Sequence, residues 1–186
     1  MTMEAAIAGY LIEAGISRFT VRGSAGGLLS GLGHNPVVSV TDFTGEAQWD
    51  PSAPAQASLR LRIRAAALAV QNDISDKDRR EMERVMKAEV LETDKYPDIV
   101  FESTGASASA NGRVDIDGDL TLHGITRKQR ISAQLALTGD MLRAFGEFSI
   151  LQTDYRIKLA SVAGGALKLK DELKFSFDIV ARKRTE

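Results

Sequence analysis

The sequence predicts an all-β fold: an extended antiparallel barrel of eight strands with one amphipathic helix. Two observations predict it. First, apolar and charged residues alternate along several segments, as where Leu59, Leu61 and Ile63 are interleaved with three arginines. A period of two is typical of an antiparallel sheet with one face in water. Second, a single segment has the helical period, so the sheet must hide its apolar face by closing on itself.

The composition limits the number of domains and the class of partner. At 186 residues the chain fits one domain that can bury its own core. Its 24 basic and 25 acidic residues leave a net charge of −1, which argues against nucleic-acid binding. The sequence has no cysteine, which excludes disulfides, thiolate zinc sites and cysteine nucleophiles.

The N-terminal region lacks the features of a secretory signal. The first basic residue is Arg18, and the apolar stretch 5–12 has neither the length nor the cationic start of such a signal. Apolar runs also stay well short of the roughly 20 residues that cross a bilayer. We therefore expect a cytoplasmic protein without stable membrane insertion.

The predicted elements form one barrel domain over residues 10–183, preceded by a flexible segment over 1–9. Glycines and a proline in 23–36 predict a loop after the first strand, and Pro51 and Pro54 end the second. The turn before the last strand is expected at Gly164 and Gly165. The alternation places strands over residues 10–22, 37–49, 58–70, 99–104, 113–123, 129–137, 142–153, 155–162 and 173–182.

One amphipathic helix is predicted over about residues 76–92. Apolar residues from Met82 to Val90 fall at i, i+3, i+4 and i+8, with charges between them. Ser75 or Asp76 can accept the unpaired backbone amides of the first turn. Pro97 bars continuation of the helix and favours extended geometry at Tyr96, so the next strand follows. The single apolar stripe must dock on the sheet, and we expect it at an end or flank where it could close a barrel mouth.

Three motifs in order carry a resemblance to a known family. They are 18–21 (Arg-Phe-Thr-Val), 96–103 (Tyr-Pro-Asp-Ile-Val-Phe-Glu-Ser) and 118–126 (Gly-Asp-Leu-Thr-Leu-His-Gly-Ile-Thr). With the helix placed just before the second motif, the chain resembles the YceI family of lipocalin-like, polyisoprenoid-binding proteins over about residues 10–182. The resemblance implies an eight-stranded lipocalin-like barrel whose lumen holds a long isoprenoid or other amphiphilic lipid. We expect no cofactor besides such a bound lipid.

The phase of the alternation selects the residues expected to line that lumen. An apolar lumen gains roughly 25 cal/mol per Å² of hydrocarbon that it removes from water, so a long chain needs no polar contact to its tail. A charged head group would stay near a mouth. The candidate ligand-binding residues are Phe19, Val21, Leu59, Leu61, Ile63, Phe101, Val114, Ile116, Leu120, Leu122, Phe148, Tyr155, Phe175 and Phe177.

Small residues in the same phase favour a hollow lumen. An eight-stranded barrel can be filled by side chains or hold one small ligand, and the interior side-chain volume decides between the two. A packed lumen would need larger residues at such positions. Alternatively, these residues contact the helix or a neighbouring strand. They are Ala65, Ala67, Ala133, Ala144 and Gly146.

The two histidines, His34 and His123, do not form a recognisable metal or catalytic motif. His123 is out of phase with Leu120 and Leu122, which predicts an outer or strand-end position and a role in a hydrogen-bonded turn. The glycine-rich segment 23–27 lacks the lysine of a phosphate loop. We therefore assign no catalytic residue and no metal ligand.

Three functions follow as hypotheses. The leading one is a non-enzymatic carrier or store for a polyisoprenoid, an isoprenoid quinone or a fatty-acid-like amphiphile. The second is an enzyme that acts on such a lipid, with His34 or His123 as acid or base. The third is a protein-interaction module that uses a strand edge or the helix. The oligomeric state stays open, a homodimer included.

Overall fold

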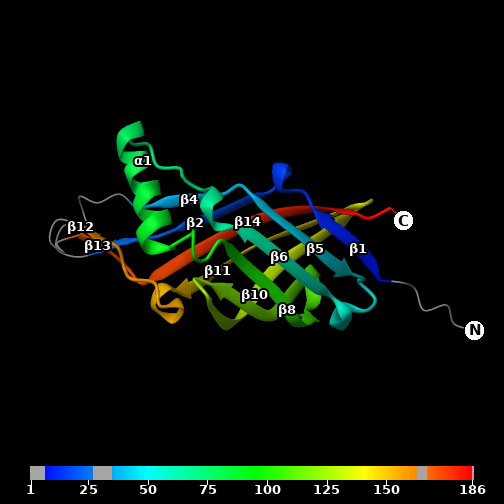
Figure 1. Cartoon of the computed structure of the whole chain (residues 1–186). Coiled ribbons are helices and arrows are strands. Elements are labelled where there is room, and N and C mark those ends of the chain that lie inside the picture. The colour runs from blue at the N-terminus through cyan, green and yellow to red at the C-terminus, as the bar shows by residue number, and fades with distance from the viewer. Residues whose placement is uncertain (1–6, 27–34, 163–166, 186) are drawn as a thin grey trace, which may run out of the picture.

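The barrel closes through strand β1, which pairs with a strand on each side. In this computed structural model, which describes residues 7–26, 35–162 and 167–185, β1 (Ala8–Ile12) pairs antiparallel with β5 (Phe43–Trp49) and with β14 (Glu172–Lys183). The last strand thus returns to the first (Figure 1). The predicted eight-stranded antiparallel barrel is confirmed.

Three of the eight wall positions contain two strands in succession. In each pair a short break divides one long strand, so the halves follow each other along the wall. The broken positions are β1 with β2 (Arg18–Arg22), β4 (Val37–Val40) with β5, and β6 (Ser58–Arg64) with β7 (Leu68–Val70). The remaining wall strands are β8 (Asp98–Ala108), β9 (Arg113–Leu122), β10 (Ile125–Thr138), β11 (Met141–Leu151) and β14.

At the break between β1 and β2 the chain contains more residues than the stretch of β14 opposite it. The pairing registers differ on its two sides, and the surplus forms the short 3₁₀ turn η1 (Ala14–Ile16). The Ser17 hydroxyl accepts a hydrogen bond from the Val180 backbone amide at 2.9 Å and donates one to the Glu13 carbonyl at 2.7 Å. The sequence prediction of one strand over 10–22 missed this break. It also began the barrel two residues late, because β1 starts at Ala8.

The predicted strand over 155–162 is wrong. Residues Gln152–Tyr155 form a 3₁₀ turn (η7), and Arg156 has a φ of 55°, which ends extended geometry. Within 155–162, strand pairing is found at β12 (Ser161–Val162) alone. This strand pairs with β13 (Leu167–Leu169), which pairs in turn with β3 (Ala25–Gly26). This small sheet is separate from the barrel wall and lies at the same end as the helix (Figure 1).

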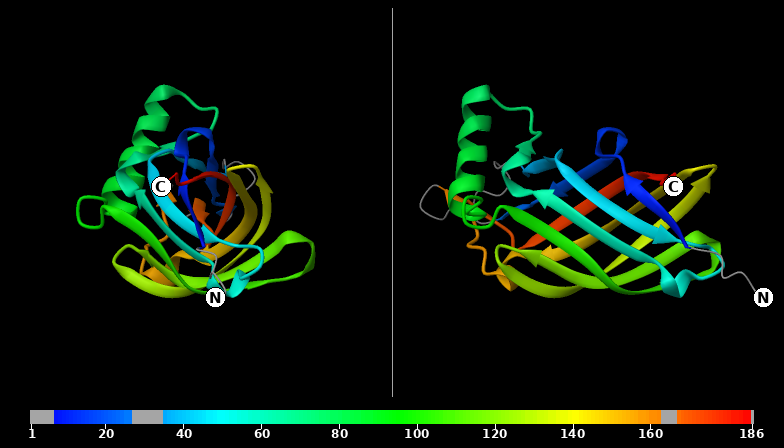
Figure 2. Two further views of the ribbon diagram at one scale, coloured as in Figure 1. Left: turned by 90° about the vertical axis from the view of Figure 1, so that its right-hand side faces the viewer. Right: turned by 45° about the vertical axis from the view of Figure 1, so that its right-hand side comes forward.

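Helix α1 (Asp76–Val85) stands across one end of the barrel and continues as a π-helical turn, η5 (Met86–Val90) (Figure 2). The predicted helix is confirmed except for its last two residues. Ser75 is the N-cap, and its hydroxyl accepts a hydrogen bond from the Asp78 backbone amide at 3.1 Å. The same end contains β7, so the helix and this strand are neighbours.

The opposite end of the barrel is filled by side chains. Tyr10, Leu142 and Ala181 are buried there as one cluster, and Trp49 and Leu135 pack against it. Tyr10 is only 3% exposed, and its burial raises the pKa of its hydroxyl group. We call Tyr10, Leu142 and Ala181 the floor of the barrel.

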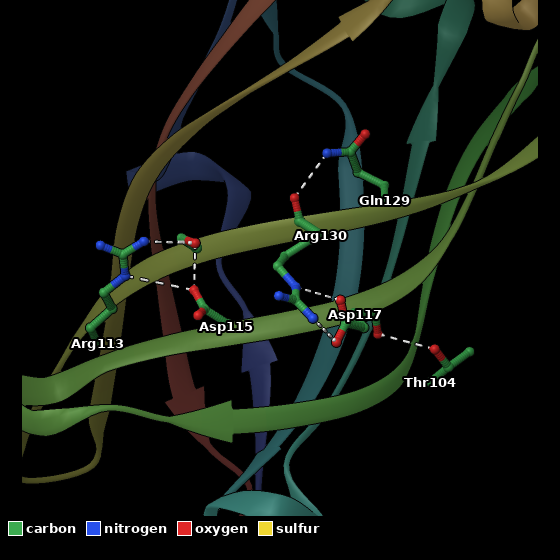
Figure 3. A network of polar contacts seen from close by, with 7 residues as sticks. Thr104, Arg113, Asp115, Asp117, Gln129 and Arg130 are labelled. Atoms are coloured by element: carbon green, nitrogen blue, oxygen red, sulfur yellow. Dashed lines mark hydrogen bonds and ion pairs between the residues drawn. The ribbon is translucent and has the colours of Figure 1, made fainter.

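The outer face contains cross-strand ion pairs (Figure 3). Asp117 on β9 and Arg130 on β10 are register partners, and both guanidinium contacts are short, at 2.7 and 2.9 Å. Asp115 contacts the Ser132 hydroxyl, and its carboxylate lies 3.6 Å from the Arg113 guanidinium. Such exposed pairs contribute little to stability, because water and salt screen them. Their larger effect is on orientation, since a slip of one residue would turn these charges into the apolar interior.

Candidate ligand-binding cavity

The interior of the barrel contains a cavity of about 880 Å³. Pockets for small organic ligands commonly range over roughly 300–1,000 Å³, so this cavity is at the large end. It extends from helix α1 to the floor, since residues of both ends line it. The hollow lumen expected from the sequence is therefore present.

All but two of the residues predicted to line the lumen do so. The exceptions are Val114 and Tyr155. Val114 has the inward phase but is 1% exposed, since neighbouring side chains cover it completely. Tyr155 lies on η7, where the strand period no longer applies, and it belongs to a buried hydrophobic cluster that includes Phe101 and Leu120. The predicted residues that line the cavity are Phe19, Val21, Leu59, Leu61, Ile63, Phe101, Ile116, Leu120, Leu122, Phe148, Phe175 and Phe177.

Four phenylalanines pack against one another in this wall. Phe148 and Phe175 stack with ring centroids 4.6 Å apart and planes at 11°. Phe19 lies 6.1 Å from Phe175 and 6.4 Å from Phe177 in tilted and edge-on arrangements. Such pairs add about 0.5–1.5 kcal/mol beyond area burial. The contacts among these rings therefore stabilise this part of the wall.

The small residues make space at some positions and not at others. Ala133 and Ala144 line the cavity as expected. Ala65 begins the 3₁₀ turn η4 (Ala65–Ala67), which divides β6 from β7, so this stretch is not an inward-facing wall. Gly146 admits the ring of Phe177, because a Cβ built there would lie 2.9 Å from the Cζ atom of that ring. The alternative explanation, contact with a neighbouring strand, therefore holds for Gly146.

The sequence reasoning missed the lining residues on the helix. It predicted the apolar stripe and its docking over a barrel mouth, but it did not count the stripe as part of the site. Helix α1 and η5 turn this stripe toward the cavity, and Leu91 and Ile74 line it on either side. The stripe consists of Met82, Val85, Met86 and Val90.

The polar residues that line the cavity lie at the helix end. Among the described residues, Asn72, Asp73, Ser75, Asp78 and Glu81 come from the start of α1 and the segment before it, while Gln152 and Lys168 come from η7 and β13. The rest of the lining is apolar down to the floor. The arrangement suits an amphiphile whose tail lies in the barrel and whose head group lies at this polar end, which we call the mouth.

His123 is a structural turn residue away from the cavity. With φ angles of 51° and 71°, His123 and Gly124 form the two-residue hairpin turn between β9 and β10. The imidazole Nε2 lies 2.8 Å from a Glu92 carboxylate oxygen, and Nδ1 lies 3.1 Å from the Tyr155 carbonyl oxygen. The Tyr96 ring packs on it with centroids 4.5 Å apart. The prediction of a hydrogen-bonded turn is confirmed.

The described residues offer little for other chemistry. His34 falls outside them, so its predicted alternative role as acid or base stays a prediction. Within residues 7–26, 35–162 and 167–185, no group of three acidic or histidine side chains is arranged to hold a metal ion. The helices in these ranges are too short or too polar to cross a membrane.

Comparison with solved structures shows the same barrel in two other proteins. BcnA of Burkholderia cenocepacia superposes with a TM-score of 0.74 at 17% identity, over 91% of this chain and 98% of BcnA. A polyisoprenoid-binding domain from Saccharophagus degradans superposes with a TM-score of 0.67 at 12% identity, over 96% of this chain and 99% of that domain. At these identities the likeness concerns the fold.

Comparison of sequences adds the family. A UPF0312 protein of Shewanella baltica is 30% identical over 132 residues, which are 70% of this chain and 64% of the relative. A UPF0312 protein of Pseudomonas putida is 31% identical over 86 residues, which are 46% of this chain and 42% of the relative. The matches therefore span less than two thirds of these relatives. The YceI-like domain pattern matches residues 14–181. The chain belongs to the YceI-like family.

Proposed function

We propose that this protein binds, carries or stores one amphiphilic lipid with a long hydrocarbon tail, such as a polyisoprenoid, an isoprenoid quinone or a fatty-acid-like molecule. The observation that carries the proposal is the cavity of about 880 Å³ with an apolar wall and a polar mouth. The description of the Saccharophagus degradans domain as polyisoprenoid-binding gives further support.

The hydrophobic effect is large enough for useful affinity. Removing about 400 Å² of hydrocarbon from water at roughly 25 cal/mol per Å² contributes about 10 kcal/mol. Ordering the tail and losing free translation offset several kcal/mol of this. The remainder corresponds to dissociation constants on the order of micromolar or tighter.

The surroundings of His123 favour binding over catalysis. Both ring nitrogens already have partners, Glu92 and the Tyr155 carbonyl, and the residue does not line the cavity. We therefore propose a binding protein and not an enzyme.

Native mass spectrometry of the purified chain tests the proposal. We expect a 20.1 kDa protein with additional mass from one lipid, which organic extraction releases and which liquid chromatography identifies. The delipidated protein should rebind prenols of increasing chain length with one-to-one stoichiometry. Absence of bound lipid together with failure to rebind any prenol, quinone or fatty acid would contradict the proposal.

A further inference from the structure

The floor lies at a fixed depth below the helix end of the lumen. Leu173 and Ala181 both line the cavity and are eight residues apart on β14. Leu173 packs on the same apolar cluster as Leu91, which follows η5, whereas Ala181 belongs to the floor. A β-strand rises about 3.3 Å per residue and is inclined at about 40° to the axis of such a barrel, so the lumen is about 20 Å deep between these residues.

The floor stops a tail at a defined side chain. Leu142 lines the cavity, whereas Tyr10 does not line it and is buried behind Leu142 in the same cluster. Tyr10 is enclosed further by Trp49 and Leu135, which pack against the cluster. A tail in the lumen can therefore reach Leu142 and Ala181, and the packed side chains behind them end its path.

The wall directly above the floor is lined by small side chains. Ala47 is the register partner of Tyr10 on β5, and it lines the cavity together with Ala133 and Ala144. Methyl groups at these positions leave the space that larger side chains would fill. The hollow part of the lumen therefore continues down to the floor.

Depth and volume limit the length of the tail. An extended chain spans about 3.5 Å for every three backbone bonds, so an isoprene unit with its four bonds spans about 4.5 Å, and about four units fit the depth. A non-hydrogen atom in a liquid occupies about 30 Å³, the share of one water molecule, so the whole cavity of about 880 Å³ holds at most about 30 such atoms. These atoms correspond to about six isoprene units.

From the depth, the floor and the volume we infer that the lumen selects its lipid by tail length, at about four to six isoprene units, with the tail end against Leu142 and Ala181. The inference rests on the proposed function, since it assumes that a lipid tail occupies the barrel. A shorter tail leaves part of the apolar wall without contacts. A longer tail leaves hydrocarbon outside the mouth in water.

A competition between prenols of different length tests the inference. The delipidated protein is incubated with phosphatidylcholine vesicles that contain equimolar farnesol, geranylgeraniol, hexaprenol and solanesol, in order of increasing length. It is then repurified, and its bound lipid is extracted and quantified by liquid chromatography. Because every prenol starts in a bilayer, removal of hydrocarbon from water does not by itself favour the longest one.

We expect geranylgeraniol and hexaprenol to be enriched about tenfold or more over solanesol, because each methylene group left outside the lumen loses a several-fold contribution to binding. Geranylgeraniol should also exceed farnesol. Enrichment of solanesol equal to that of hexaprenol, or of farnesol above geranylgeraniol, would overturn the inference and leave the proposed function intact. Failure to bind any prenol, in a protein that also rejects quinones and fatty acids, would instead contradict the proposed function.

Variants at the floor should shift the preferred length in opposite directions. Ala47→Leu adds bulk just above the floor and should favour farnesol, whereas Leu142→Ala deepens the lumen and should favour longer prenols than the wild type. The matched control Leu11→Ala removes the same atoms from an exposed side chain of β1 and should leave the preference unchanged. Circular dichroism identifies a variant that fails to fold, and Ala47→Leu still tests the inference if Leu142→Ala does so. An unchanged length preference in the folded variants would contradict the role of the floor.

Discussion

The Glu83 carboxylate accepts a hydrogen bond from the backbone amide of Val70, with 2.9 Å between Oε1 and the nitrogen. Val70 ends β7, and among the described strands β7 pairs with β4 on one side only. The helix side chain thus occupies the place of a missing strand neighbour and ties α1 to the barrel wall.

We predict that Glu83→Ala loosens the helix end of the barrel. Loss of the acceptor leaves the amide of the buried Val70 without its partner, which should lower the free energy of unfolding by about 1–3 kcal/mol. Hydrogen exchange at Val70 should accelerate, and lipid uptake should become faster. Glu83→Gln keeps a carbonyl acceptor and is the control. Equal exchange rates in the two variants would show that the contact does not hold the helix.

Filling the lumen should reduce lipid binding. Ala144 lines the cavity from β11, so Ala144→Phe is expected to lower the amount of copurified lipid severalfold or shift it to shorter tails. Ala136→Phe, on the exposed face of β10, introduces the same ring outside the barrel and serves as the control. Lipid extracted from both variants can be quantified against protein mass. Equal lipid content in the two would place the ligand elsewhere.

Two glycines with positive φ should differ in their tolerance of alanine. Gly124 has a φ of 71°, and a Cβ there would lie 2.5 Å from the Tyr96 Cε1 atom, whereas Gly139 has a φ of 58° and open space around it. Gly139→Ala should cost about 1–2 kcal/mol from backbone strain alone. Gly124→Ala should cost about 1–3 kcal/mol more, since the Tyr96 ring must move. Urea unfolding curves measure both, and equal losses would contradict the packing argument.

Stability should fall in acid through carboxylates held by hydrogen bonds. The Thr153 hydroxyl and backbone amide lower the pKa of Asp171, and the guanidinium of Arg130 lowers the pKa of Asp117. A carboxyl group with a lowered folded-state pKa stabilises the fold above its unfolded pKa of about 3.9, and this contribution is lost as the pH falls through the folded-state value. The urea midpoint should therefore decrease below about pH 4.

Thr153→Val tests one of these contributions. It removes the hydroxyl donor to Asp171 and should make the decrease below pH 4 shallower. Thr20→Val, on β2 and distant from Asp171 in the sequence, is the control and should leave the pH profile parallel to that of the wild type. Identical profiles for both variants would assign the acid sensitivity to other carboxylates.

The long strands could be predicted from the sequence because local alternation and burial agree in them. On β9 the buried positions all fall in one phase of the strand, and the charged residues fall in the other. At 155–162 the same reasoning failed. Tyr155 and Ile157 are both buried and two residues apart, which imitates a strand, yet the backbone turns between them at Arg156. An alternation of buried and exposed residues indicates which side chains are buried and not which backbone geometry buries them. Here the buried residues belong to a turn that packs on the barrel.

The site was predictable where it follows from strand phase alone. Phe175 and Phe177 line the cavity because their phase on β14 points inward. Val114 shares the inward phase of its strand but is covered by its neighbours, which depends on packing between strands. The contributions of Met86 and Gln152 depend on how a helix and a turn dock, and sequence spacing does not encode that.

The floor of Tyr10, Leu142 and Ala181 closes one end of the lumen, so a lipid bound as proposed would enter and leave at the helix end. A lipid whose head group stays at the helix end must enter with its hydrocarbon tail first, and it leaves with its head group first. In a bilayer the head group of a lipid faces the water. Transfer between this lumen and a membrane leaflet would therefore require the lipid to reverse its orientation, or α1 to move aside so that the tail can leave laterally.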